Sequence, residues 1–207
     1  GSSEQYPNSP MGAVALVRQA LLDADWYQRA QQAAAANARL PRPDTSAALQ
    51  ALEPAIRARQ AVVIDGTNEL YALRADRLAR EFLLKLIIRG SGREYRQLDA
   101  LAATGRTFII PVDFPDAPKL STEGEVLDTT LQTLMHWRLA PENPARLEQA
   151  GVDFVLTTSG LAKPTELLSK LRSAIAVGLS EHKALSALTS EPARLLGVEQ
   201  LVGTLEV

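Results

Sequence analysis

Four short, mostly apolar segments of the sequence are each followed by polar residues that can do chemistry. Segments 61–64, 84–88, 107–112 and 152–156 are rich in β-branched residues, which is typical of buried strands. Carboxylates there can bind a metal ion or move a proton, a guanidinium can bind an anion, and a hydroxyl can cap a loop. The candidate pocket-lining residues that follow the segments are Asp65, Thr67, Asn68, Arg89, Asp113, Thr158 and Ser159.

Helical segments separate these apolar segments and must position their ends. The spacing predicts helices over 69–82 and 93–103, and a longer connection with helices over 125–138 and 143–150. Helices that alternate with continuous apolar strands predict βαβ units and a parallel α/β sheet. The carboxyl ends of parallel strands meet at one edge, so the polar residues are expected to share that edge.

The rest of the chain divides by composition. Residues 1–10 are polar and predict an extended lead-in. Residues 11–60 predict a helical segment of two leading helices, over 11–39 and 47–59, and Pro54 is expected to kink the second or mark its true start. Residues 61–200 form the predicted β/α unit, and 201–207 resemble the start of another strand.

Composition excludes several classes of function. The chain has 207 residues, with 22 Lys and Arg against 24 Asp and Glu, so it lacks the basic surplus of a nucleic-acid-binding protein. It has no Cys and only two His, which excludes thiolate chemistry and leaves little for a multi-His metal site. No apolar segment approaches the ~18 residues of a membrane span.

The C-terminal third resembles the amidohydrolase superfamily. Residues 151–160, GVDFVLTTSG, look like the last barrel strand of that family, and the helix over 166–178 like the helix that follows it. Residues 184–197 resemble its A-L-x-A-x-T-x-x-P-A-x-x-L-G signature, and 203–206, GTLE, the entry into its small β domain. The middle strands are similar, more loosely, to the imidazolonepropionase-like branch.

This resemblance implies the C-terminal half of a β/α barrel (a partial TIM barrel). A whole barrel has eight strands and ~250 residues. The first half is then expected upstream of residue 1, and residues 201–207 are expected to begin a truncated β domain. The family is bacterial in many members, and the resemblance leaves periplasmic, secreted and cytoplasmic locations open.

The resemblance also implies a zinc-like divalent metal for the parent family, but the ligand positions of this chain differ. Asp65 stands where the family places a metal-binding His, no His follows the second strand, and Ser159 stands where the family has a metal-binding, proton-shuttling Asp. A neutral serine does neither task well. We therefore expect no catalytic metal, and no other cofactor, in this chain.

Individual residues have plainer interpretations beside these. Ser159 has no nearby His and is expected to cap its loop. The loop 90–92, Gly-Ser-Gly, can cradle an anion beside Arg89, or form a tight turn, which the short pattern favours. Asp113 either lines a pocket or caps a loop. His136 and His182 are expected to be surface or packing residues, and Trp26 and Trp137 to be packing residues rather than residues that stack on a ligand.

The leading hypothesis is a piece of an amidohydrolase-like hydrolase of non-peptide C–N bonds, degenerate or inactive in isolation. The alternative is an assembly module, in which the half-barrel forms a homodimer or pairs with a missing half across its open sheet edges. A third is a small doubly wound domain that binds a small-molecule ligand, although no nucleotide-binding glycine motif is present.

Overall fold

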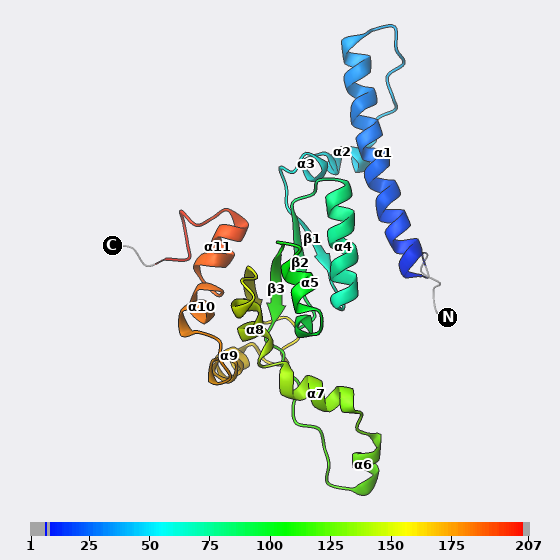
Figure 1. Ribbon diagram of the computed structural model, residues 1–207. Coiled ribbons are helices and arrows are strands. Elements are labelled where there is room, and N and C mark those ends of the chain that lie inside the picture. Colours follow the sequence, from blue (N-terminus) through cyan, green and yellow to red (C-terminus); the bar gives the residue numbers. More distant parts are fainter. Residues whose placement is uncertain (1–6, 8, 205–207) are drawn as a thin grey trace. The chain divides into compact units, whose positions relative to one another are not determined.

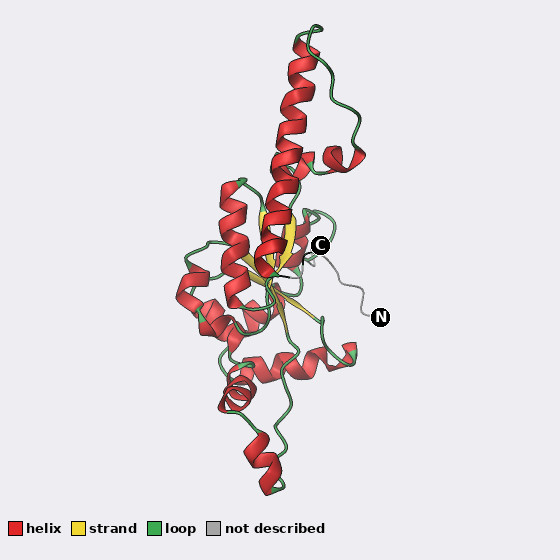
Figure 2. Cartoon of the chain, turned by 90° about the vertical axis from the view of Figure 1, so that its right-hand side faces the viewer, coloured by secondary structure: helices red, strands yellow, loops and turns green. Residues whose placement is uncertain are grey.

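The strands form one parallel sheet in the order β1-β2-β3-β4. Figure 1 draws strands as arrows, and Figure 2 shows them in yellow among the red helices. The computed structural model describes residues 7 and 9 to 204. Within them lie β1 (Val62–Asp65), β2 (Leu86–Arg89), β3 (Thr107–Pro111) and β4 (Phe154–Thr157). The predicted parallel β/α class is confirmed, and the arrangement is consistent with a partial β/α barrel.

Helices join and follow the strands. The connections and the C-terminal segment comprise α4 (Glu69–Glu81), η1 (Glu94–Arg96), α5 (Leu98–Ala102), α6 (Glu123–Asp128), α7 (Leu131–Leu139), α8 (Asn143–Gln149), η2 (Pro164–Glu166), α9 (Leu167–Ala176), α10 (Glu181–Ser186) and α11 (Ser190–Leu196).

Side chains alternate across the sheet and divide it into two faces. Phe108 and Ile110 of β3 are fully buried, whereas Ile109 between them is half-buried. The register places Phe108 beside Phe154 of β4, and the Lys183 ammonium of α10 lies 4.7 Å from the Phe154 ring centroid. The face with Phe108 and Phe154 therefore packs against helices, and residues of opposite parity point to the other face.

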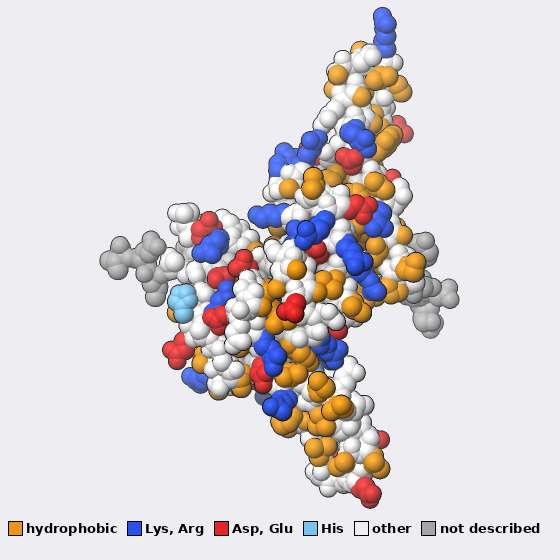
Figure 3. All heavy atoms as spheres, viewed as in Figure 1, with side chains coloured by type: hydrophobic (Ala, Val, Ile, Leu, Met, Phe, Trp, Pro, Cys, Tyr) orange, Lys and Arg blue, Asp and Glu red, His pale blue; other side chains and the backbone are white. Residues whose placement is uncertain are grey.

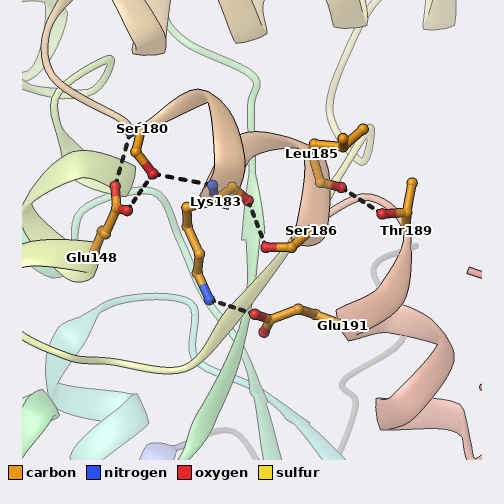
Figure 4. Close-up of polar contacts among 7 residues, drawn as sticks. All are labelled: Glu148, Ser180, Lys183, Leu185, Ser186, Thr189 and Glu191. Carbon is orange, nitrogen blue, oxygen red and sulfur yellow. Dashed lines mark hydrogen bonds and ion pairs between the residues drawn. The ribbon is translucent and has the colours of Figure 1, made fainter. Parts of the chain in front are cut away.

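Polar contacts join the C-terminal helices α10 and α11 to each other and to α8 (Figure 4). Both the amide and the hydroxyl of Ser180 donate to the Glu148 carboxylate of α8. The Ser180 hydroxyl also accepts from the Lys183 amide, so Ser180 is the N-cap of α10. The Lys183 ammonium reaches Glu191 of α11 at 3.0 Å. These contacts link α8, α10 and α11 in sequence.

Two helices predicted as continuous are each broken in two. The segment 93–103 splits into η1 and α5, and 125–138 splits into α6 and α7. At the second break the Thr129 hydroxyl donates to the Glu125 carbonyl, and the Thr130 hydroxyl accepts from the Thr133 amide as the N-cap of α7. Threonine side chains compete for backbone groups in this way, which favours a cap over a helix interior.

The leading segment contains α1 (Pro10–Ala36), α2 (Ala47–Ala51) and α3 (Glu53–Ile56). Pro54 lies in the first turn of α3, so it marks a new helix, as predicted. The loop after α1 runs back along that helix (Figure 2), and the Tyr27 hydroxyl accepts hydrogen bonds from the Ser46 amide and the Gln50 side chain. Of the described residues, 7, 9–62 and 77–85 form one compact unit, and 63–76 and 86–204 form a second.

The predictions for the termini fall partly outside the described residues. Of the lead-in, residues 1–6 and 8 are not described, and Pro10 already belongs to α1. At the other end, 201–203 form a turn and bends and no strand begins at 201–204, and 205–207 lie outside the described part.

Several large apolar side chains are exposed. Trp26 and Trp137 are 57% and 42% exposed, so neither lies in the buried core. Hydrophobic side chains gather over α6 and α7 in Figure 3, from the exposed residues Val126, Leu127, Leu131, Met135 and Trp137. Among the described residues, no helix combines the length and the apolar character that crossing a membrane requires.

Candidate functional site

The last residue of every strand lines one hollow of about 360 Å³. Asp65, Arg89, Pro111 and Thr157 end β1, β2, β3 and β4 respectively, and all four belong to its wall. The carboxyl ends of parallel strands meet at one edge, which explains why residues far apart in sequence meet here. The remaining wall is formed by Gly66, Thr67, Gly90, Ser91, Asp113, Ser159 and Gly160.

An ion pair dominates one side of the hollow. The Arg89 Nε lies 2.5 Å from Asp65 Oδ1, and its Nη2 lies 2.8 Å from Oδ2, so the contact is bidentate. The Gly66 amide donates to the Arg89 carbonyl, which aligns the two strand ends. The side chains are 51% and 54% exposed, so both remain accessible from the hollow.

A second carboxylate lies beside the loop that follows β4. A Cβ atom at Gly160 would lie 2.6 Å from Asp113 Oδ2, and Gly160 has φ +94°. Only glycine combines this backbone conformation with such a close approach. Gly160 therefore lets Asp113 lie directly against the β4 loop, on the wall of the same hollow.

The loop 90–92 is a tight turn closed by a carboxylate of this chain. The Ser91 and Gly92 amides donate to Glu94 Oε1 at 2.6 and 3.2 Å. These amides are thus already engaged, so the favoured interpretation as a tight turn is confirmed and the alternative of an anion cradle is wrong. The other oxygen, Glu94 Oε2, accepts from the Asn143 side chain at 2.7 Å, and Glu94 is only 2% exposed.

Only some of the remaining predicted residues line the hollow. Thr67 and Ser159 line the hollow, whereas Asn68 and Thr158 do not. The Asn68 side chain accepts from the Leu70 amide at 3.0 Å and so serves the start of α4. The Ser159 amide donates to the Thr157 hydroxyl, which orders the turn after β4.

Neither histidine belongs to this site. His182 is exposed on α10. His136 of α7 stacks on Tyr95, and its Nδ1 lies 3.1 Å from the Tyr95 hydroxyl. Burial lowers the pKa of His136, and the positive charges of Arg93 and Arg96 lower it further. His136 therefore makes a packing contact, in which its surroundings favour the neutral imidazole.

The residues of the hollow do not fit a divalent metal. The Asp65 carboxylate is engaged by a guanidinium, and that positive charge would repel a second cation beside it. Ser159 offers a neutral hydroxyl, a weak ligand compared with carboxylate or imidazole. Within residues 7 and 9 to 204, no three His, Cys, Asp or Glu side chains form a group that could hold a metal ion.

Comparison with solved structures gives the class of fold. The chain is similar to an amidohydrolase from Thermotoga maritima MSB8, with a TM-score of 0.77 and 23% sequence identity. The match covers 98% of this chain and 49% of that protein, so the chain spans about half its length. No family model matches the chain, and the search of curated proteins found no match. The chain therefore has an amidohydrolase-like fold.

Sequence reasoning missed Glu94, although a signal for it was present. Ser91 and Glu94 have the S-x-x-E spacing of a capping box, in which a glutamate side chain bonds back to the amide three residues earlier. That is the contact observed between Glu94 and the Ser91 amide. The S-x-x-E spacing was therefore the signal that could have indicated the role of Glu94 in this loop.

Proposed function

We propose that this chain is the second β/α half of an amidohydrolase-like barrel and that it does not hydrolyse C–N bonds on its own. The Asp65–Arg89 ion pair carries the proposal. It stands at the strand ends where the family resemblance expects metal-binding histidines. The span of about half the Thermotoga protein supports the assignment to half a barrel.

The chemistry explains why hydrolysis is not expected. A divalent ion activates water by lowering its pKa to near neutrality, and this requires ligands that hold the ion firmly. In the hollow, one carboxylate is paired with Arg89 and the other, Asp113, lies against Gly160. Neither has an imidazole beside it among the wall residues, so no ligand set for an activating metal is assembled.

Metal-supplemented assays test this proposal. We expect the purified chain with added zinc or manganese to open no cyclic amide and cleave no acyl-amide above the rate of metal alone. Asp65→Asn and, as a matched control, Asp99→Asn on an exposed part of α5 are assayed beside it. Turnover that needs zinc, and that Asp65→Asn removes but Asp99→Asn retains, would contradict the proposal.

The alternative function, an assembly module, is favoured by β1, which lies at one end of the strand order β1-β2-β3-β4. Val63 of β1 is 53% exposed, so this terminal strand presents an apolar side chain on its face. The two edges differ, because the Leu156 amide of β4 already donates to the Ala187 carbonyl at 3.0 Å. An exposed edge strand is a template for pairing with another chain. The second candidate function is therefore a two-fold dimer, in which β1 of one copy of the chain pairs with β1 of another copy.

Sedimentation measurements test the dimer. We expect a concentration-dependent dimer that Val63→Lys dissociates, because a lysine on an edge strand opposes edge-to-edge pairing. Val177→Lys, which replaces an exposed valine just after α9, is the matched control and should leave the dimer intact. A monodisperse monomer at high protein concentration would remove this candidate.

A further inference from the structure

The ion pair in the hollow contributes little to stability. Exposed ion pairs contribute about 0–1 kcal/mol, and Asp65 and Arg89 are each about half exposed. The pair nevertheless joins the last residues of two strands in a bidentate geometry, and it holds the guanidinium at the wall of a hollow. A fixed and accessible guanidinium is a common means of recognising a carboxylate.

The guanidinium has donors to spare. Arginine carries five N–H donors, and Asp65 uses those on Nε and one on Nη2. The edge formed by Nη1 and Nη2 faces away from Asp65, and a planar guanidinium can bind one carboxylate on each edge. Because Asp65 already fixes the plane of the group, little further ordering of the side chain is required when a second carboxylate binds.

The charge balance of the wall selects the ligand further. Arg89 is the basic residue among the wall residues, and Asp65 and Asp113 are the acidic ones. Asp65 offsets Arg89, which leaves the Asp113 carboxylate as the net charge. A simple carboxylate would be attracted by Arg89 but repelled by Asp113, whereas a molecule that also carries an ammonium group would satisfy both.

We propose that the hollow at the strand ends is a metal-independent binding site for a small zwitterion of the amino-acid class. Arg89 binds the carboxylate of the ligand, and Asp65 is the positioning residue that holds Arg89 in place. Asp113 binds the ammonium group, and Gly160 allows it to lie close to the β4 loop. This inference rests on the proposed function, because it gives the strand-end site a ligand in place of a metal.

A matched set of three compounds tests the site in the presence of EDTA. L-Leucine carries both charges, L-leucinamide lacks the carboxylate, and isocaproate lacks the ammonium group. We expect leucine to shift the amide resonances of Gly66, Gly90 and Gly160 of the isotope-labelled chain, saturating in the millimolar range. The other two compounds should bind roughly tenfold more weakly or worse, the effect of losing one charged contact.

Variants identify the residues responsible. Arg89→Met should abolish the shifts, and Asp113→Asn should remove the preference for leucine over isocaproate. Arg29→Met, which breaks the exposed Arg29–Asp25 pair of α1, is the control and should bind like the parent chain. Dispersed amide spectra establish that each variant is folded.

Three results would overturn the site: no shifts with leucine, equal binding of leucinamide, or binding that appears only when zinc replaces EDTA. None of them depends on turnover. Absence of binding leaves the half-barrel proposal standing, while zinc-dependent hydrolysis contradicts that proposal through a separate assay.

Discussion

Glu94→Ala is expected to lower the free energy of unfolding by about 3 kcal/mol. Glu94 is almost fully buried, and its carboxylate accepts from the Ser91 and Gly92 amides and from the Asn143 side chain. Hydrogen bonds to a charged group contribute about 1.5–3 kcal/mol each, and a buried donor left without an acceptor costs about 1–3 kcal/mol. Alanine would leave all three donors without this acceptor.

Thermal unfolding measures the effect. For a chain of this size the loss corresponds to a decrease in Tm of roughly 6–12 °C. Glu94→Gln should lose less, because one amide oxygen can still accept from the loop. The NH2 group of the new glutamine would then face the NH2 group of Asn143. The Asn143 side-chain amide cannot rotate by 180° to relieve this, because its oxygen accepts a hydrogen bond from the Tyr95 amide. Glu181→Ala, at an exposed carboxylate of α10, is the control and should change Tm little.

Removal of the Glu94 carboxylate is also expected to disturb the wall of the hollow. Gly90 and Ser91 line it, and a Cβ at Gly90 would lie 2.6 Å from Glu94 Oε1. Glu94 therefore holds the loop 90–92 in place, and Arg89, the residue before this loop, lines the hollow. Unchanged stability and unchanged amide shifts of Gly90 in Glu94→Ala would mean that other contacts hold this loop.

The fold class could be predicted because the sequence patterns that indicate strands and helices are local. The four strands were predicted from short runs of β-branched residues, and their parallel order from the helices between them. Errors arose where side chains compete with the backbone. Thr129 and Thr130 break one predicted helix, and periodicity alone does not register such a break.

The candidate site was only partly predictable, because pairing between strands is not written in local patterns. Asp65 and Arg89 were both singled out at strand ends, but nothing in the sequence indicated that they would bind each other. The approach of Asp113 to Gly160 likewise depends on the neighbouring positions of β3 and β4. Asn68 and Thr158 are also polar residues that follow β1 and β4, but they do not line the hollow. The Asn68 side chain instead accepts a hydrogen bond from the Leu70 amide.

Phe154→Ala is expected to cost about 3–5 kcal/mol, the usual range for removing a buried aromatic side chain. Phe154 is fully buried on the helix-facing side of β4, beside Phe108 of β3. Its ring also lies 4.7 Å from the Lys183 ammonium, whose side chain is 15% exposed, and a cation–π contact is worth about 0.5–1 kcal/mol when exposed and about 2 kcal/mol when desolvated. Chemical denaturation measures the loss, and Trp137→Ala, at an exposed aromatic residue, should lose much less.

The comparison of these two variants also tests the assignment of the two faces of β4. Side chains alternate along β4, so a Phe154 that packs against the helices requires Thr157 on the opposite face, and the register places Thr157 beside Pro111. A loss of stability in Phe154→Ala no larger than that in Trp137→Ala would mean that the helix-facing side of β4 is not a packed layer.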